Sequence, residues 1–307
     1  MQKCLKCLKA LGSSDEYDGT GLHAQCYLDY FGIKNLEPLS SFKRRATSKE
    51  PKRENDSSWN TSFFHGMFKK YSATLVEQSY IVKVKEEAVP ELPDVEYLCN
   101  KIGRTLGVGV PDFYVIKLFG ERTFLTKNFV RKNSGPANLT HIYHFLKKDD
   151  QYDCETLIHV ILEQTENIVE AEKFVEMCLF DSLIGNSDRH GRNIGLITTS
   201  DGTRLAPIYD NPSALGLESG EILNADWNPT GKVAVKDGEN PSSTDYIREF
   251  RRLGYDSSVK RFIGKANKSK NRIKKSILES FCSDLMKRAM ERLIFKRLKE
   301  MNDEVNT

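Results

Sequence analysis

Three oxygen-bearing side chains between residues 185 and 212 have types and spacing that could do chemistry together. Asp188 and Asn193 lie five residues apart in a polar loop, and Asp210 stands at the far end of the apolar hairpin that follows. Because a hairpin returns the chain to its starting point, we expect Asp210 to lie beside Asn193. A converging amide oxygen and carboxylate are hard ligands of the kind that Mg²⁺ takes. Asp188 would face the same space without being needed as a ligand, and could orient or deprotonate a hydroxyl nucleophile.

This order of residues is the phosphoryl-transfer template of protein kinases: a catalytic Asp, a downstream metal-binding Asn and a second metal-binding Asp. The template also needs a strand lysine that binds nucleotide phosphates and a glutamate on the next helix that orients it. Lys83, in the apolar run 81–84, and Glu96 fit these roles, and Lys85 and Glu91 are the alternatives. The competing interpretation is purely structural: a capped Asp-Arg-His turn and a solvated strand lysine.

The elements that must position these residues change character along the chain. The runs 72–76 and 79–84 predict one hairpin, and the runs 113–118 and 123–126 predict another. Between them, apolar residues at helical spacing predict a helix over 95–106.

After residue 136 the pattern becomes helical. A helix over 170–185 precedes the polar loop, and the runs 194–197 and 205–209 predict strand, turn and strand. Further helices are expected over 240–300, the last one spanning about 269–301. Strands followed by helices favour an α+β fold with a strand-rich lobe and a helical lobe.

The predicted domain organisation has four parts. They are a Cys- and His-bearing segment (1–36), a polar mobile linker (37–58), a strand-rich N-lobe (59–130) and a helical C-lobe (131–307). The linker is assigned because so polar a stretch cannot bury much surface.

Composition excludes several classes of protein. The chain has 307 residues and is 39% hydrophobic, so it is not wholly disordered, and it has no apolar run long enough to span a membrane. Seven cysteines, an odd number, argue against a disulfide scaffold and for a reducing compartment. Without an apolar leader, we expect a bacterial cytoplasmic protein, or export by a route that needs no signal peptide. The net charge of +3 alone predicts no nucleic-acid partner.

Two segments of the sequence resemble the HipA-like serine/threonine kinases: 183–193 and 205–210, which read LIGNSDRHGRN and LAPIYD. Residues 79–98 are similar to that family's nucleotide-lysine strand and following helix. The N-terminal cysteines and histidine are similar to the start of its short members, the HipT-like toxins and secreted CtkA-like kinases. The resemblance covers most of residues 1–260. It implies a bilobal, divergent protein-kinase-like fold and an autophosphorylating serine/threonine kinase that uses ATP and Mg²⁺.

The resemblance also implies roles for single residues. Asp188 would be the catalytic base, His190 would help to shape the catalytic loop, and Lys83 would bind the α- and β-phosphates. Asn193 and Asp210 would hold Mg²⁺ and with it the nucleotide.

A hinge and partners follow from the same resemblance. The hinge that meets adenine through backbone groups would consist of Lys127, Asn128 and Phe129, although the family often has Glu where Lys127 stands. A cognate antitoxin and a substrate protein of translation, such as an aminoacyl-tRNA synthetase, are the partners that the family suggests.

The phosphate loop departs from the family. It would span 59–67 and include Ser62 and Gly66, but it holds one glycine and two phenylalanines where the family is rich in Ser, Gly and Ala. A serine of this loop is autophosphorylated in the family, which ejects the loop. Ser62 is the nearest match, with Ser57 and Ser58 as alternatives.

Four N-terminal residues have the spacing of zinc ligands, in two pairs fifteen residues apart: Cys4, Cys7, His23 and Cys26. A short segment with little core would gain stability from a metal. The alternative is that the cysteines are small apolar packing residues, and the sequence favours it because the family fold does not require zinc.

Residues 248–299 carry 17 Lys or Arg against 5 Asp or Glu. This basic stretch is either a solvated helical surface or a docking face for an acidic or RNA-bound partner. Two other functions therefore stay open. One is a lipid kinase, because phosphoinositide kinases carry a similar Asp-Arg-His-x-x-Asn loop. The other is a binding module that uses the basic stretch and transfers no phosphate.

Overall fold

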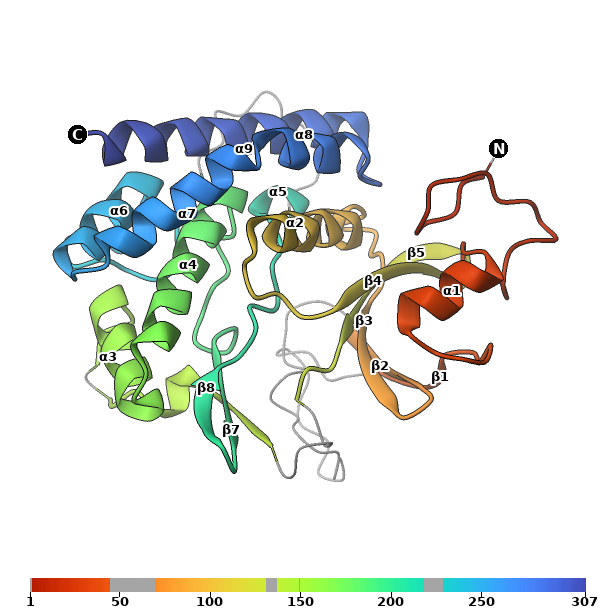
Figure 1. Cartoon of the computed structure of the whole chain (residues 1–307), viewed down its shortest axis with the longest axis horizontal. Coiled ribbons are helices and arrows are strands. Elements are labelled where there is room, and N and C mark those ends of the chain that lie inside the picture. The colour runs from red at the N-terminus through yellow and green to blue at the C-terminus, as the bar shows by residue number, and fades with distance from the viewer. Residues whose placement is uncertain (1, 45–69, 131–136, 149, 218–228) are drawn as a thin grey trace. The chain divides into compact units, whose positions relative to one another are not determined.

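The chain forms two compact units (Figure 1). The computed structural model describes residues 2–44, 70–130, 137–148, 150–217 and 229–307. Unit 1 comprises residues 1–97 and 111–129, and unit 2 comprises residues 98–110 and 130–307. Unit 1 is built on an antiparallel sheet and unit 2 is largely helical, which confirms the expected α+β class.

The sheet of unit 1 has five antiparallel strands in the order β1-β2-β3-β5-β4. They are β1 (Ser40–Arg44), β2 (Lys70–Leu75), β3 (Gln78–Lys83), β4 (Phe113–Leu118) and β5 (Glu121–Lys127). The β2–β3 and β4–β5 pairs are the two predicted hairpins. Strand β1 lies inside the predicted linker, pairs with β2 and is exposed along its length. Helix α1 (Ala24–Phe31) lies in the N-terminal segment.

Helix α2 (Leu92–Leu106) follows β3. The sequence boundary between unit 1 and unit 2 falls within this helix, after Tyr97. Its predicted apolar stripe is buried, with Val95, Leu98 and Ile102 fully covered. The helix begins before the predicted position 95. Asp94, in its first turn, accepts two hydrogen bonds from Arg122 of β5, at 2.9 and 2.7 Å, which fixes the start of the helix to the sheet of unit 1.

Unit 2 is organised around α4 (Ile168–Ile184), which packs against four other helices (Figure 1). These are α3 (Cys154–Thr165), α6 (Ser243–Arg252), α7 (Asp256–Lys268) and α9 (Asp284–Val305). Because α4 is surrounded, nearly its whole C-terminal half is buried, including the acid Asp181. Short helices η2 (Ile142–His144) and α5 (Ala214–Leu217) complete the described part of this unit, together with α8 (Lys270–Leu278).

A small antiparallel sheet in unit 2 contains the predicted hairpin. Its order is β6 (Asn138–His141), β7 (Gly195–Thr199) and β8 (Gly202–Leu205). Strand β6 lies where the sequence indicated helix. The second strand ends at Leu205 instead of continuing to Tyr209, as is expected beside Pro207, which has no N–H for a ladder.

The prediction of one last helix over about 269–301 was wrong. The segment forms two helices, α8 and α9, separated at residues 279–283. Ser283 begins α9 as its N-cap, accepting a hydrogen bond from the amide of Met286 at 3.2 Å. A capping serine at this position stabilises the start of a new helix. No described helix is long and apolar enough to cross a membrane.

Candidate active site

The loop that carries Asp188 is positioned by the end of α4. Gly185 ends this helix in the left-handed conformation, with φ 69°, and the amide of Asn186 donates to the carbonyl of Asp181. The Asn186 side chain then donates to the Asp181 carboxylate at 2.8 Å and accepts from the amide of Asp188 at 3.0 Å. The loop therefore leaves the helix along a path that the side chain of Asn186 fixes.

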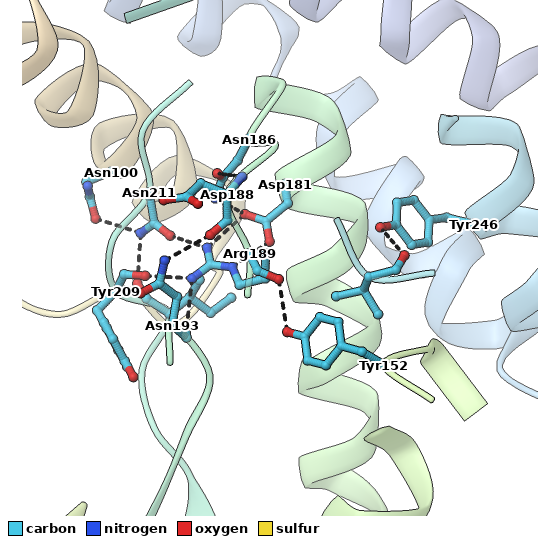
Figure 2. Close-up of polar contacts among 12 residues, drawn as sticks. Asn100, Tyr152, Asp181, Asn186, Asp188, Arg189, Asn193, Tyr209, Asn211 and Tyr246 are labelled. Carbon is cyan, nitrogen blue, oxygen red and sulfur yellow. Dashed lines mark hydrogen bonds and ion pairs between the residues drawn. The ribbon is translucent and has the colours of Figure 1, made fainter. Parts of the chain in front are cut away.

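Arg189 is the centre of the loop (Figure 2). Its side chain is 1% exposed, and its Nε and Nη2 donate to the two carboxylate oxygens of Asp181 at 2.7 and 2.8 Å. Burial opposes the guanidinium charge, but the carboxylates of Asp181 and Asp210 outweigh it and raise the pKa of Arg189 above its ordinary value. Arg189 is thus a permanently charged, fully paired group inside unit 2.

The other donors of Arg189 join the two ends of the hairpin. Its Nη1 donates to the carbonyls of Asn193, at 3.0 Å, and of Tyr209, at 2.6 Å. Its Nη2 donates to Oδ1 of Asn211 at 2.7 Å. One guanidinium therefore holds the backbone carbonyls of Asn193 and Tyr209 and the side chain of Asn211, which brings together two positions that the sequence predicted to converge.

Asp188 and His190 lie at the partly exposed side of this loop. The His190 Nδ1 accepts from the amide of Arg192 at 3.2 Å, so in the neutral ring the proton is on Nε2, which lies 3.9 Å from Oδ1 of Asp188. Burial lowers the pKa of His190, and the carboxylates of Asp188 and Asp210 only partly offset it. At neutral pH the loop therefore presents a neutral imidazole beside a carboxylate.

Asn193 and Asp210 are suited to a hard cation. The side-chain nitrogen of Asn193 donates to the carbonyl of Asp188 at 2.9 Å. The side-chain oxygen of Asn193 therefore faces away from that carbonyl, and the side chain is buried. Asp210 has φ 57°, a left-handed conformation that Asp tolerates better than most residues. A carboxylate and an amide oxygen are the donor set that Mg²⁺ takes in proteins, so these residues fit the ion.

Four polar contacts hold the residues on either side of Asp210. Asn211 donates to the carbonyl of Ile208 at 2.8 Å and to Oδ1 of Asn100 on α2 at 3.1 Å. The hydroxyl of Tyr209 donates a hydrogen bond to the carbonyl of Arg192, and its oxygen lies 3.1 Å from Nδ1 of the buried His141. Both residues flanking Asp210 are thus held by groups distant in the sequence.

In unit 1, Lys83 and Glu96 form the pair that the kinase template requires. The Lys83 Nζ donates to both carboxylate oxygens of Glu96, at 2.5 and 2.6 Å, and both side chains are nearly buried. The alternative lysine, Lys85, is exposed and pairs with Glu121 of β5 at 3.6 Å. The structure thus distinguishes the two lysines, which the strand pattern did not.

The predicted hinge residues end β5 and follow it. The amide of Lys127 donates to the carbonyl of Asp112 at 2.8 Å, and the amide of Asn128 donates to the carbonyl of Ser79 at 2.9 Å. Both amides are therefore engaged within unit 1. The predicted phosphate loop lies outside the described residues, together with Ser57, Ser58, Ser62 and Gly66.

The sequence interpretation assigned no role to Asp181, Arg189 or Asn211. Asp181 lies within the predicted helix over 170–185. One signal could have identified it: an acid in the middle of an otherwise apolar helix is costly to bury unless a cation meets it. At the N-terminus, the structure brings Cys4, Cys7, His23 and Cys26 into one cluster.

Comparison with known proteins places this chain in a family. The HipA-like C-terminal domain family matches residues 62–292. "Putative kinase Y4dM" of Sinorhizobium fredii is 27% identical over 175 residues, which cover 51% of this chain and 43% of that protein. A "Putative kinase" of Haemophilus influenzae is 28% identical over 151 residues, which cover 43% of this chain and 44% of that protein. The match thus spans less than half the length of either curated relative.

Two solved structures share the fold. The Helicobacter pylori proinflammatory kinase CtkA superposes with a TM-score of 0.64 at 17% identity, covering 78% of this chain and 90% of that one. HipA from the Shewanella oneidensis MR-1 complex of HipA, HipB and operator DNA superposes with a TM-score of 0.58 at 17% identity. That match covers 74% of this chain and 60% of HipA. The fold is kinase-like, and the chain belongs to the HipA-like C-terminal domain family.

Proposed function

We propose that this chain is an ATP- and Mg²⁺-dependent kinase that phosphorylates serine or threonine in proteins, itself included. The observation that carries the proposal is the Arg189 network. One buried charge holds the backbone carbonyls of Asn193 and Tyr209 and the side chain of Asn211, and Asp188 lies on the same loop. A binding module would not need an acid, an amide and a second acid held in this way.

Each residue has a role within its own unit. Asp188 would orient the hydroxyl of the substrate and accept its proton, and His190 would support the loop as a neutral neighbour of that carboxylate. Asn193 and Asp210 would hold Mg²⁺, which when bound neutralises phosphate charge. Lys83, paired with and oriented by Glu96, would bind the nucleotide phosphates.

The remaining assignments are part of the same proposal. Lys127, Asn128 and Phe129 would contact adenine, but the amides of Lys127 and Asn128 already donate within unit 1, so carbonyl groups are the better candidates for this contact. The loop 59–67 would cover the phosphates through Gly66, and autophosphorylation would fall on Ser62 in the loop or on Ser57 or Ser58 just before it.

The biological setting is proposed from the family. HipA of Shewanella oneidensis was solved with HipB and operator DNA as a toxin–antitoxin system, and CtkA is a proinflammatory kinase. We extend both roles to this chain as alternatives: a toxin kinase with a cognate antitoxin and a bacterial protein target, or an effector that acts on a host protein.

The test is transfer of labelled phosphate from ATP with Mg²⁺, using protein first treated with phosphatase. We expect wild type to label itself, and Asp188→Asn and Asp210→Asn to lose transfer by more than about 10²-fold. Asp201→Asn is the matched control, because Asp201 is an exposed acid on the turn of the same hairpin. Peptide mapping would then locate the labelled serine.

The outcomes separate the competing functions. Labelling of liposomes but not of protein would favour a lipid kinase. A folded wild type that binds ATP but labels neither itself nor a generic protein or lipid acceptor would favour the binding module and end the kinase proposal.

A further inference from the structure

The N-terminal segment of unit 1 holds a cluster of side chains that the proposed kinase chemistry does not use. We propose that Cys4, Cys7, His23 and Cys26 form a closed structural zinc site. One potential ligand atom from each residue lies within 4.8 Å of all the others, although the two pairs are fifteen residues apart in the sequence. All four residues precede the first strand of the sheet and have no role in the proposed kinase chemistry. The zinc proposal is therefore independent of the kinase function.

Two sulfur–nitrogen distances in the cluster match those of a tetrahedral zinc site. With Zn–S bonds of about 2.3 Å and a Zn–N bond of about 2.0–2.1 Å, tetrahedral angles place sulfur and nitrogen about 3.6 Å apart. The Sγ atoms of Cys7 and Cys26 lie 3.6 and 3.7 Å from Nδ1 of His23. All three cysteines are free thiols.

A backbone carbonyl behind His23 orients its ring. The Nε2 of His23 lies 3.0 Å from the carbonyl of Ala10, so Nε2 donates its proton there and Nδ1 keeps a lone pair facing the sulfurs of Cys7 and Cys26.

The packing interpretation explains these observations less well. Cys4 is buried, but Cys7, His23 and Cys26 are only partly buried, so three of the four are not core residues. Three thiols and an imidazole favour zinc over hard cations, and four protein ligands leave no open position for substrate. The site is therefore expected to be structural, and each zinc bound would displace the protons of the three thiols.

The site would stabilise a segment that covers the edge of the sheet. Strand β4 is the last strand in the sheet of unit 1, and an exposed edge strand invites unwanted pairing. The carbonyl of Thr20 accepts from the amide of Lys117 at 2.7 Å, and the hydroxyl of Tyr30 accepts from the amide of Val115 at 3.3 Å. Zinc would hold residues 4–26, which contain Thr20 and lead into the helix that carries Tyr30, in the conformation that makes these contacts.

The test uses the full chain, refolded or expressed with zinc supplied, and measures metal content after gel filtration. We expect about one zinc per chain in wild type and less than about 0.1 in Cys7→Ser and His23→Gln. His23→Cys should keep the metal, because four thiolates also bind zinc. Cys282→Ser and His159→Gln, which change residues outside the cluster, should keep it as well.

A second measurement decides the matter if the variants fail to fold. Alkylation of native wild-type protein followed by peptide mapping should show Cys7 and Cys26 protected, and a chelator should make both reactive and lower the melting temperature. Replacement by Co²⁺ should give the intense visible bands of a tetrahedral thiolate site. Wild type without zinc after reconstitution, or zinc retained in both Cys7→Ser and His23→Gln, would overturn the proposal.

Discussion

At the scale of single residues, the loop at 186–193 depends on the charge of Arg189, which is buried away from solvent. Arg189 carries a full positive charge at 1% exposure, and Asp181 offers it a buried counter-charge in direct contact. Its remaining donors go to oxygens of Asn193, Tyr209 and Asn211. Breaking such a pair on one side leaves an uncompensated charge, whereas removing both sides leaves none.

We therefore expect Asp181→Asn to lower the free energy of unfolding by about 3–5 kcal/mol. The double variant Asp181→Asn/Arg189→Met should lose much less than the sum of its two single changes, because it removes both buried charges. Urea unfolding measures both effects. The control is Glu172→Gln, which removes a partly exposed partner of Arg261 and should cost less than about 1 kcal/mol. Additive losses in the double variant would contradict the coupling.

His190 offers a titration at the same scale. Because burial lowers its pKa, we expect its NMR titration midpoint below the ordinary value of about 6.5. Asp188→Asn should lower the midpoint further by removing a charge that raises it, and Arg192→Gln should raise it by removing a charge that lowers it. Shifts of the same sign in the two variants would show that neighbouring charges do not set this pKa.

The sign of the stability effect follows from the depressed pKa. The folded state disfavours the protonated ring, so the contribution of His190 to stability is fully present above the unfolded pKa of about 6.5. It is lost as the pH falls through the lower folded pKa. The side chain is 38% exposed, so solvent screening keeps this contribution small.

At the scale of elements, helix α4 both supplies Asp181 and determines where the loop begins. Gly185 ends the helix with φ 69°, and a Cβ there would stand 2.7 Å from Cδ2 of Leu293 and 2.8 Å from Cγ of Pro229. Conformation and space therefore both require glycine. In contrast, Gly264 lies inside α7, where a Cβ would meet nothing within 4 Å.

The two glycines should respond to the same substitution with opposite signs. We expect Gly185→Ala to lower the free energy of unfolding by more than about 1 kcal/mol, through strain and overpacking. Gly264→Ala should raise it by about 0.5–1 kcal/mol, because alanine is the better helix former. Thermal or urea unfolding of the two variants gives the comparison. A stabilised Gly185→Ala would mean that the helix end can shift without cost.

At the scale of the whole molecule, the basic stretch 248–299 is less exposed electrostatically than its composition indicates. In α6, Arg248 pairs with Glu304 of α9, and Arg252 pairs with Glu155 at the start of α3. In α7, Arg261 and Lys265 both lie near Glu176 of α4. Acids on the neighbouring helices thus neutralise part of the local excess, which favours the interpretation as a solvated helical surface.

We accordingly expect only non-specific binding of RNA to the full chain. Fluorescence anisotropy with a labelled single-stranded RNA should give a Kd in the range of about 10⁻⁴–10⁻⁶ M at physiological salt, and tighter at low salt. Lys287→Glu/Arg288→Glu, which reverses two basic residues of α9, should weaken the residual binding and lower its salt dependence. Submicromolar binding at physiological salt would instead support a docking face for nucleic acid.

The amino-acid sequence by itself determined those features that depend on neighbours along the chain. Period-two runs gave the hairpins β2–β3 and β4–β5, and helical spacing gave the buried stripe of α2. The spacing of Asp188, Asn193 and Asp210 identified the candidate site before any contact was known. These signals are local, because backbone period and turn residues act within a few positions.

The tertiary structure alone decided which polar groups meet. Lys83 rather than Lys85 pairs with Glu96, and the break before α9 interrupts what looked like one helix. Arg189 takes partners from α4 and from beyond β8, and Asn211 reaches Asn100 across 111 positions. A buried charge or amide is tolerated only where distant groups satisfy its hydrogen bonds. No local pattern in the sequence specifies those partners, because packing brings them together.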